Sequence, residues 1–326
     1  MKEMNFNEFT KVIGEQIKNY LPEEYQTGEI VIKNYCGLNG KRLTGFKVKR
    51  PYPHIPAMIY LNDYYNKFKN GYDFDCLIQT IANDYKHAEC SLFNVDFLSN
   101  FENCKEFIHP KLINARMNSK MLEIHPHVLI EDLAVVFYIE FSKSDDESRS
   151  ITITNDILNL WNIDLNTLYN QSVENLSIHS LPVCKSMTEM FIEKIMDQSN
   201  LNYEMARDIF YAMFPEDLPM YVITNKSLQY GASSILDQEF MKKTLEKLGS
   251  NFYFIPSSIH ELLLFPMTDI TSVEEIENII GEVNSTLVQD DELLSDHVYT
   301  YSIEYGLQSI SCLNPANPDC FTDYTM

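Results

Sequence analysis

The chain has 326 residues, of which 45% are apolar and 22% are charged, with 10 glycines and 13 prolines. These values exclude a collagen-like, low-complexity or wholly disordered protein, because a chain this apolar can bury enough surface to offset the entropy lost on ordering. With 47 acidic and 25 basic residues, the net charge is −22. This charge opposes general affinity for nucleic acid or for an anionic membrane, so we expect neither as a partner.

The charge is unevenly distributed along the chain. Residues 1–70 carry 11 basic and 7 acidic side chains, whereas residues 71–326 carry 14 basic and 40 acidic ones. The N-terminal segment is therefore mildly basic and the remainder strongly acidic.

Targeting signals and cysteine usage together indicate a cytosolic protein. Residues 1–10 contain Glu3 and Glu8 and lack the apolar region of a signal peptide, and no apolar run is long enough for a membrane span. The seven cysteines are odd in number and form no CxxC pair, which favours free thiols over a disulfide framework or a zinc ribbon.

The first 90 residues predict a helix, a meander of strands and two more helices. Asn5 to Tyr20 has apolar residues at spacings of three and four, and Asn5 with Glu8 forms a plausible capping pair. Short extended runs divided by glycine and proline follow, as is typical of an antiparallel meander, at residues 30–35, 43–49 and 55–61. Helices are predicted at residues 63–69 and 73–87.

The middle of the chain is dominated by one apolar run. Residues 133–141 (LAVVFYIEF) are rich in β-branched and aromatic side chains, which indicates a central strand covered on both faces. The polar tract 142–148 then predicts a turn, and residues 151–154 predict the partner strand of a hairpin. Residues 91–129 keep neither a helical nor a strand period, so no element is predicted there.

The last part of the chain alternates helices with short strands. Helices are predicted at residues 164–176, 187–196, 203–213, 237–248 and 272–287, with Asp164, Asp237 and Ser272 as their capping residues where a cap is seen. Strands are predicted at residues 220–224, 251–255, 262–265 and 298–303, the last of them at a sheet edge.

Helices that alternate with small groups of antiparallel strands favour an α+β fold over a doubly wound α/β fold. A domain boundary is expected between Ser177 and Pro182, because Pro182 prevents the preceding helix from continuing. We expect an N-terminal α+β region over residues 1–178, a C-terminal α+β region over 179–310 and a flexible tail over 311–326.

No phosphate-binding, zinc-protease, esterase or kinase motif occurs, and the closest approach to a catalytic site is the tract PSSIHE. It places Ser257, Ser258, His260 and Glu261 within one predicted turn. A nucleophile, a base and an acid are the groups that acyl transfer needs. Adjacent residues rarely supply that geometry, however, and Ser258 with Glu261 also fits a local capping box. We favour the capping interpretation and keep the catalytic one as an alternative.

Two further clusters have simpler interpretations. His125 and His127, with Glu131 and Asp132 nearby, resemble a set of metal ligands, but Pro126 weakens the strand that would align them. We expect surface histidines there, with no metal and no other cofactor. The acidic run 274–296 lacks the DxDxDG loop of an EF-hand calcium site.

The basic residues of the meander alternate with aromatic ones, as on some nucleic-acid-binding faces. We favour the solvated side of a sheet, because the acidic remainder of the chain would repel phosphate. Docking of this basic face on the acidic part of the chain is the other interpretation. The residues concerned are Lys41, Arg42, Lys47, Lys49 and Arg50, interleaved with Tyr35, Phe46 and Tyr52.

Four long tracts of the sequence resemble a bacterial family of domains of unknown function. The tracts are PAMIYLNDYYNKFKNGYDFD (56–75), TNKSLQYGASSIL (224–236), KLGSNFYFIPSSIHELLLFP (247–266) and EVNSTLVQDDELLSDHVYTY (282–301). The resemblance covers nearly the whole chain and implies a cytosolic bacterial protein, but it implies no mechanism. It also implies that family motifs include Asn225, Gly231, Ser257, Ser258, His260, Glu261, Asn284 and Asp296.

Three polar clusters of the C-terminal half follow strands or a helix end, around Asn225, around His260, and around Asn284 with Asp296. We expect them to converge on one groove that binds a peptide or a small polar ligand. The sequence therefore favours a non-enzymatic cytosolic interaction or regulatory protein. The alternative is a hydrolase that uses Ser257 or Ser258 with His260.

Overall fold

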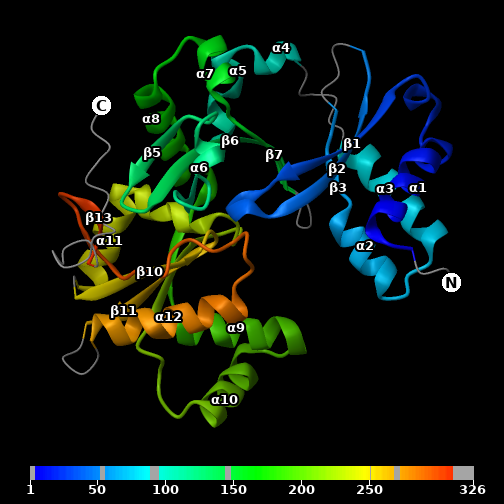
Figure 1. Cartoon of the computed structure of the whole chain (residues 1–326). Helices are drawn as coiled ribbons and strands as arrows, with labels where there is room; N and C mark the ends of the chain where they lie inside the picture. Colours follow the sequence, from blue (N-terminus) through cyan, green and yellow to red (C-terminus); the bar gives the residue numbers. More distant parts are fainter. Residues whose placement is uncertain are drawn as a thin grey trace. The chain divides into compact units, whose positions relative to one another are not determined.

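The computed structural model describes residues 4–51, 56–88, 95–143, 148–249, 251–267 and 272–310. Its contacts divide the chain into two units (Figure 1). Unit 1 comprises Met1–Lys105 and Phe141–Ser150, and unit 2 comprises Glu106–Glu140 and Ile151–Met326. The predicted boundary near Pro182 falls inside unit 2, and as a statement about separate domains it stays a prediction.

Unit 1 is built around a three-stranded antiparallel sheet in the order β1-β2-β3, which is the meander that the sequence predicted. Helix α1 begins after a capping box of Asn5 and Glu8. The sheet packs against α1 and α3 around a core that includes Phe9, Phe46 and Tyr85. The elements are α1 (Phe6–Gln16), β1 (Glu29–Cys36), β2 (Arg42–Lys49), β3 (Ile59–Tyr60), α2 (Asn62–Lys69), α3 (Phe74–Ala88), α4 (Val95–Leu98) and α5 (Phe101–Cys104), with short 3₁₀ turns at Ile17–Tyr20, Glu23–Tyr25 and Leu38–Gly40.

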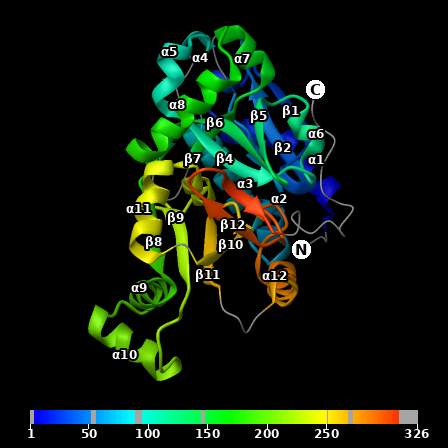
Figure 2. The ribbon, with the colours of Figure 1, turned by 90° about the vertical axis from the view of Figure 1, so that its left-hand side faces the viewer.

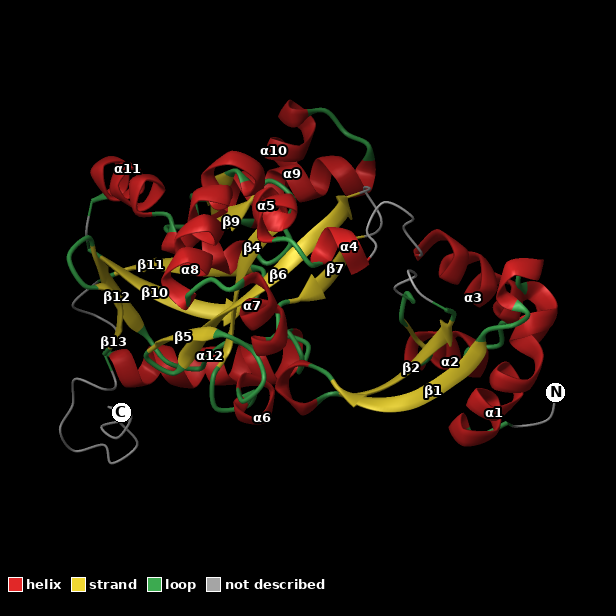
Figure 3. Ribbon diagram, turned by 90° about the horizontal axis from the view of Figure 1, so that it is seen from above, coloured by secondary structure: helices red, strands yellow, loops and turns green. Residues whose placement is uncertain are grey.

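The first sheet of unit 2 has the long apolar strand β6 (Leu133–Lys143) at its centre, as its sequence indicated. Strand β4 (Ile108–Asn114) and strand β5 (His127–Ile130) lie on either side of it, and β7 (Ser148–Thr152) also pairs with it. Neither β4 nor β5 was predicted, because Pro110 and a lysine interrupt the pattern of β4. Helices α6 (Ser119–Leu122), α7 (Asn155–Trp161) and α8 (Leu165–Asn175) follow these strands in the chain (Figure 3).

The second sheet of unit 2 has six strands in the order β13-β12-β10-β11-β9-β8. Every pairing described in it is antiparallel. The strands are β8 (Pro182–Ser186), β9 (Tyr221–Asn225), β10 (Phe252–Ser258), β11 (Glu261–Pro266), β12 (Tyr299–Ser302) and β13 (Gly306–Ser309). One sequence expectation is corrected here. Strand β12 is not at the edge of the sheet, because β13 pairs with it.

Four longer helices accompany this sheet, and two of them, α11 and α12, have the caps that the sequence predicted. Ser272 and Glu275 form the capping box of α12, and Asp237 caps α11. Figure 2 shows α11 beside β8 and β9, with the hairpin of α9 and α10 beyond the sheet. The helices are α9 (Met187–Ser199), α10 (Tyr203–Met213), α11 (Gln238–Leu248) and α12 (Val273–Leu287), with a π-helical turn, η5, at Leu176–Ser180 and a 3₁₀ segment, η6, at Gly231–Leu236.

Together, helices and antiparallel sheets make this an α+β protein, as the sequence predicted. The described residues contain no helix that is both long and apolar enough to cross a membrane. The turn predicted around residues 144–147 and the tail at 311–326 lie outside the described residues.

Candidate functional site

The tract PSSIHE forms the end of a hairpin, although the sequence predicted all of it as a turn: residues 256–258 belong to β10 and Glu261 begins β11. Strand β10 continues through Ser258, which pairs with Glu261 of β11 across a register shift. The Ser258 hydroxyl accepts a hydrogen bond from the backbone N–H of His260 at 3.2 Å. This contact closes the turn, and it replaces the capping box that the sequence suggested for Ser258 and Glu261.

The ring of His260 is held by groups other than the two serines. Its Nδ1 accepts a hydrogen bond from the backbone N–H of Tyr230 at 3.2 Å. An amide nitrogen only donates, so the ring proton of neutral His260 is on Nε2. That nitrogen lies 3.5 Å from Oε1 of Glu292, and the ring stacks on Tyr230 at a centroid distance of 5.8 Å. Neutral His260 thus has no lone pair free to take a proton from a serine.

The end of β9, at Thr224 and Asn225, meets the same turn. The Thr224 hydroxyl donates to the backbone oxygen of His260 at 2.8 Å, and a Cβ on Gly231 would lie 2.3 Å from that hydroxyl. Only glycine fits at this position without displacing backbone. Asn225 itself is buried, and its amide donates to the Gln229 carbonyl while its oxygen accepts from the Gln229 N–H. Its side chain is therefore committed to its own loop.

The third predicted cluster lies along the segment that follows α12. Asn284 donates to Asp296 at 2.7 Å, and it also contacts the Ser295 carbonyl. Ser295 and Tyr299 in turn both donate to the carboxylate of Asp132. These contacts hold the segment after α12 against the first sheet, and the buried Asn284 Oδ1 has no hydrogen-bond partner among the described residues.

Segment 290–296 connects the second cluster to the third. Its Glu292 carbonyl accepts from the Ile259 N–H at 2.8 Å, and the Ser295 N–H donates to the Pro256 carbonyl at 3.0 Å. The sequence-predicted residues are thus neighbours within unit 2, but they are bonded mainly to one another and to backbone. Their assignment as ligand-binding or catalytic groups stays a prediction.

A group of buried ionisable side chains beside His260 was missed by the sequence analysis. Lys111 of β4 is only 8% exposed, and its ammonium lies 4.4 Å from the ring centroid of Tyr230 and 5.9 Å from that of Tyr138. Burial lowers the pKa of Lys111 to about 8. Among the described residues it makes no ion pair, which is rare for a buried lysine.

The aromatic rings around Lys111 form a continuous set. Tyr138 contacts Tyr230 at a centroid distance of 5.3 Å, and His109 lies 5.6 Å from Tyr138. Burial raises the pKa of both tyrosines, and the negative charge of Glu140 raises it further. Perturbed groups of this kind concentrate at functional sites, but they also occur in structural networks. The signal available from sequence was the alternation of His109 and Lys111 in a strand, which the irregular pattern of β4 obscured.

The other predicted clusters find structural roles. Nδ1 of His125 lies 2.7 Å from the Met121 carbonyl, and Nδ1 of His127 lies 2.9 Å from the His125 carbonyl. No group of three or more metal-ligating side chains occurs among the described residues. Four cysteines in the described part of the chain are free thiols: Cys36, Cys76, Cys104 and Cys184.

The basic face of the meander belongs to unit 1. In it Arg50 stacks on the ring of Tyr25 at 4.3 Å and approaches Glu24 at 4.0 Å, so its guanidinium is engaged within the unit. Tyr52, which the sequence had placed on this face, lies outside the described residues.

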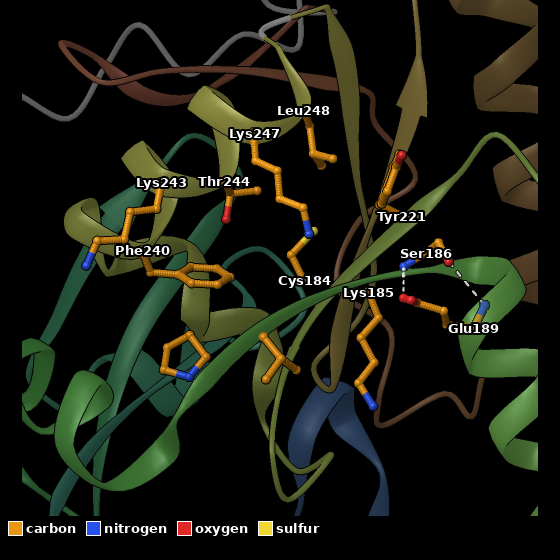
Figure 4. Close-up of a pocket in the computed structure, with 12 residues that line it drawn as sticks. Cys184, Lys185, Ser186, Glu189, Tyr221, Phe240, Lys243, Thr244, Lys247 and Leu248 are labelled. Atoms are coloured by element: carbon orange, nitrogen blue, oxygen red, sulfur yellow. Dashed lines mark hydrogen bonds between the residues drawn. The ribbon is translucent and has the colours of Figure 1, made fainter.

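A pocket of about 560 Å³ lies elsewhere in unit 2, between strand β8 and helix α11 (Figure 4). All five residues of β8 line it. From α11 it takes one stripe at helical spacing, so that a single face of the helix is turned toward the strand. The lining residues are Pro182, Val183, Cys184, Lys185, Ser186, Glu189, Tyr221, Phe240, Lys243, Thr244, Lys247 and Leu248.

We call this pocket the β8–α11 pocket. Two of its charged side chains, Lys185 and Glu189, have partners, whereas Lys247 does not form an ion pair with any described residue. Lys185 binds both carboxylate oxygens of Glu193 at 2.7 Å, and Glu189 accepts from the Ser186 N–H to close the capping box of α9. Figure 4 shows the Lys247 ammonium directed toward Cys184 inside the pocket.

Cys184 is not an activated thiol. Burial raises its pKa to about 11, even though the positive charge of Lys247 opposes this shift. The thiolate is the nucleophilic form, so Cys184 is a poor nucleophile near neutral pH. The pocket therefore combines apolar walls with lysine charges and lacks an evident reactive group.

Comparisons with known proteins give a family and nothing more specific. Neither the curated proteins nor the solved structures contain a match to this chain. A family model described as a family of unknown function matches residues 6–303. The chain therefore belongs to that family, DUF5688.

Proposed function

We propose that this chain is a non-enzymatic binding protein that recognises an anionic group in the β8–α11 pocket. The observation that carries the proposal is Lys247, a lysine directed into a pocket with no carboxylate partner among the described residues, in a chain of net charge −22. An uncompensated ammonium in a concave site favours an incoming carboxylate or phosphate.

The apolar walls of the pocket support a ligand with carbon surface as well as charge. Phe240 and Leu248 of α11 and Val183 of β8 all line the pocket. Thr244 adds a hydroxyl on α11 between Lys243 and Lys247. Concave sites of a few hundred Å³ with apolar walls and few polar groups are the usual form of a ligand site. This proposal keeps the interaction role inferred from the sequence and moves its binding site away from His260.

The hydrolase alternative receives no support from the geometry around Ser258. The serine hydroxyl is engaged with the His260 backbone, and Nδ1 of His260 accepts from Tyr230. A serine nucleophile needs an imidazole nitrogen that accepts its proton. A cytosolic location, which the free cysteines favour, is part of the proposal and is checked by fractionating cells that express the chain.

Binding of hexaglutamate tests the proposal. We expect a fluorescein-labelled hexaglutamate peptide to bind the full chain at low salt, and Lys247→Gln to weaken it about three- to tenfold, the effect of losing one or two exposed ion pairs. Fluorescence anisotropy measures the dissociation constant. The matched control is Lys242→Gln, because Lys242 is an exposed lysine of the same helix that does not line the pocket.

Two results would overturn the proposal. One is the absence of any hexaglutamate binding by the wild-type chain. The other is an equal loss of affinity in Lys242→Gln and Lys247→Gln, which would indicate attraction to the helix in general. Circular dichroism of each variant shows that the fold is retained.

A further inference from the structure

We propose that the anionic ligand of the β8–α11 pocket is an extended peptide with acidic residues at alternate positions, which pairs with β8 as a seventh strand of the sheet. The inference rests on the proposed function and specifies its ligand. Three features carry it: the position of β8 in the sheet, the spacing of the lysines on α11, and the length of the pocket.

Strand β8 is the last strand of its sheet. It pairs with β9 from Pro182 to Ser186 and with no other described strand. In an antiparallel pair, every second residue directs its N–H and C=O away from the partner strand. The bonds from Lys226 N–H to the Leu181 carbonyl and from Met187 N–H to the Met220 carbonyl leave Pro182, Cys184 and Ser186 facing away from β9. Proline has no N–H and the Ser186 N–H donates to Glu189, so the outer edge presents the Cys184 N–H together with backbone carbonyls, and such an edge is where strand addition binds a peptide.

Natural edge strands are often protected, and β8 has two features of that kind. Pro182 begins the strand and Lys185 lies within it, and both residue types discourage pairing with another chain. A third form of protection is a helix packed directly on the edge strand, which leaves no room for a further strand beside it. Here all five residues of β8 instead line an open pocket of about 560 Å³, so α11 stands off from the strand.

The lysines of α11 match the repeat of an extended peptide. Lys243 and Lys247 are four residues apart on the helix, which corresponds to a rise of about 6 Å. Alternate side chains of a strand lie on one face and are about 6.7 Å apart. A peptide along β8 with acidic residues at two alternate positions would thus bring one carboxylate to each lysine. The existing pair of Lys243 with Glu239, at 3.4 Å on the surface, is exposed and easily exchanged.

The length of the pocket sets the length of the peptide. The lining stripe of α11 runs from Phe240 to Leu248, nine residues that span about 12 Å along the helix axis. The five residues of β8 span about 13 Å. Both values correspond to four or five residues of an extended chain, long enough for two acidic side chains on one face.

Selective N-methylation distinguishes strand pairing from simple charge attraction. The probe is acetyl-Val-Glu-Val-Glu-Val-amide carrying fluorescein, and two further versions are N-methylated either at the first, third and fifth amides or at the second and fourth. A strand donates to its neighbour only through alternate amides. We therefore expect one methylated version to bind at least tenfold more weakly and the other to bind within about twofold of the parent.

The variants complete the test. The double substitution Lys243→Gln with Lys247→Gln should weaken the parent peptide about tenfold, and Lys242→Gln should leave it unchanged. Equal affinity of both methylated versions, with the lysine dependence retained, would overturn strand pairing and leave the anion-binding proposal standing. Loss of lysine dependence for this peptide and for hexaglutamate would instead overturn the proposed function.

Discussion

Lys111 shows how a single residue can oppose the stability of the fold that contains it. Its ammonium is buried against the rings of Tyr138 and Tyr230 without an ion pair among the described residues. A cation over an aromatic face recovers only part of the hydration energy that burial removes. The lowered pKa of Lys111, about 8, reflects the hydration energy of the ammonium that burial removes and the two rings do not replace.

Lys111→Met should stabilise the protein at pH 7. We expect a gain of about 1–3 kcal/mol in the free energy of unfolding, because an uncompensated buried charge is replaced by an apolar side chain of similar length. Urea unfolding followed by circular dichroism measures it. A clear loss of stability would show that the ammonium makes a favourable contact that the cation–π pairs do not explain.

The same gain should shrink as the pH is raised. Folded Lys111 releases its proton near pH 8, whereas an unfolded lysine does so near 10.5. Between these values the unfolded chain binds more protons, so the contribution of Lys111 to stability rises with pH and its cost disappears. The difference between wild type and Lys111→Met should therefore be largest below pH 8 and small at pH 10, whereas Lys242→Met, on the surface, should show no such change.

At the scale of elements, the helices were the easiest to predict. Residues Asn5, Asp164, Asp237 and Ser272 cap helices where the sequence placed them, because a cap and an apolar stripe are both local signals. Strands β4 and β8 were missed because what stabilises them is a partner strand far along the chain. The candidate pocket was missed for the same reason. Its walls, β8 and α11, are more than 50 residues apart, and neither contains a motif.

The cap of α11 should support the pocket as well as the helix. The Asp237 carboxylate accepts from the Phe240 N–H at 3.0 Å and from the Ser177 hydroxyl, and the residue is buried. Asp237→Ala should cost about 1–2 kcal/mol of stability, through the lost cap and the unpaired hydroxyl. It should also weaken the binding of hexaglutamate, because Lys243 and Lys247 would lose the fixed start of their helix.

Glu239→Gln is the matched control for this prediction. It removes a carboxylate from the same first turn of α11 without removing a capping bond, and because it also releases Lys243 from its exposed pair with Glu239, it should not weaken peptide binding. Urea unfolding and peptide anisotropy are measured on both variants. Equal destabilisation by the two substitutions would attribute the effect to the charge of the helix terminus and contradict a role of the cap.

At the scale of the whole molecule, one hydrophobic core is built entirely from residues that are close together in the chain. A core of 13 buried side chains, from Phe9 to Tyr85, is made entirely by elements between α1 and α3. The sheet of this region is also local, since β1, β2 and β3 pair in sequence order. Contacts of short sequence separation favour rapid and independent folding.

Residues 4–88 expressed alone should therefore fold. We expect a cooperative thermal transition by circular dichroism and a dispersed amide spectrum by nuclear magnetic resonance, both of which report fixed tertiary packing. Phe9→Ala in this fragment should abolish the transition, because an aromatic core substitution of this kind costs about 3–5 kcal/mol, most of the stability of so small a domain. A fragment with helical signal but no cooperative melting would contradict the prediction, since it would show that this core needs the rest of the chain.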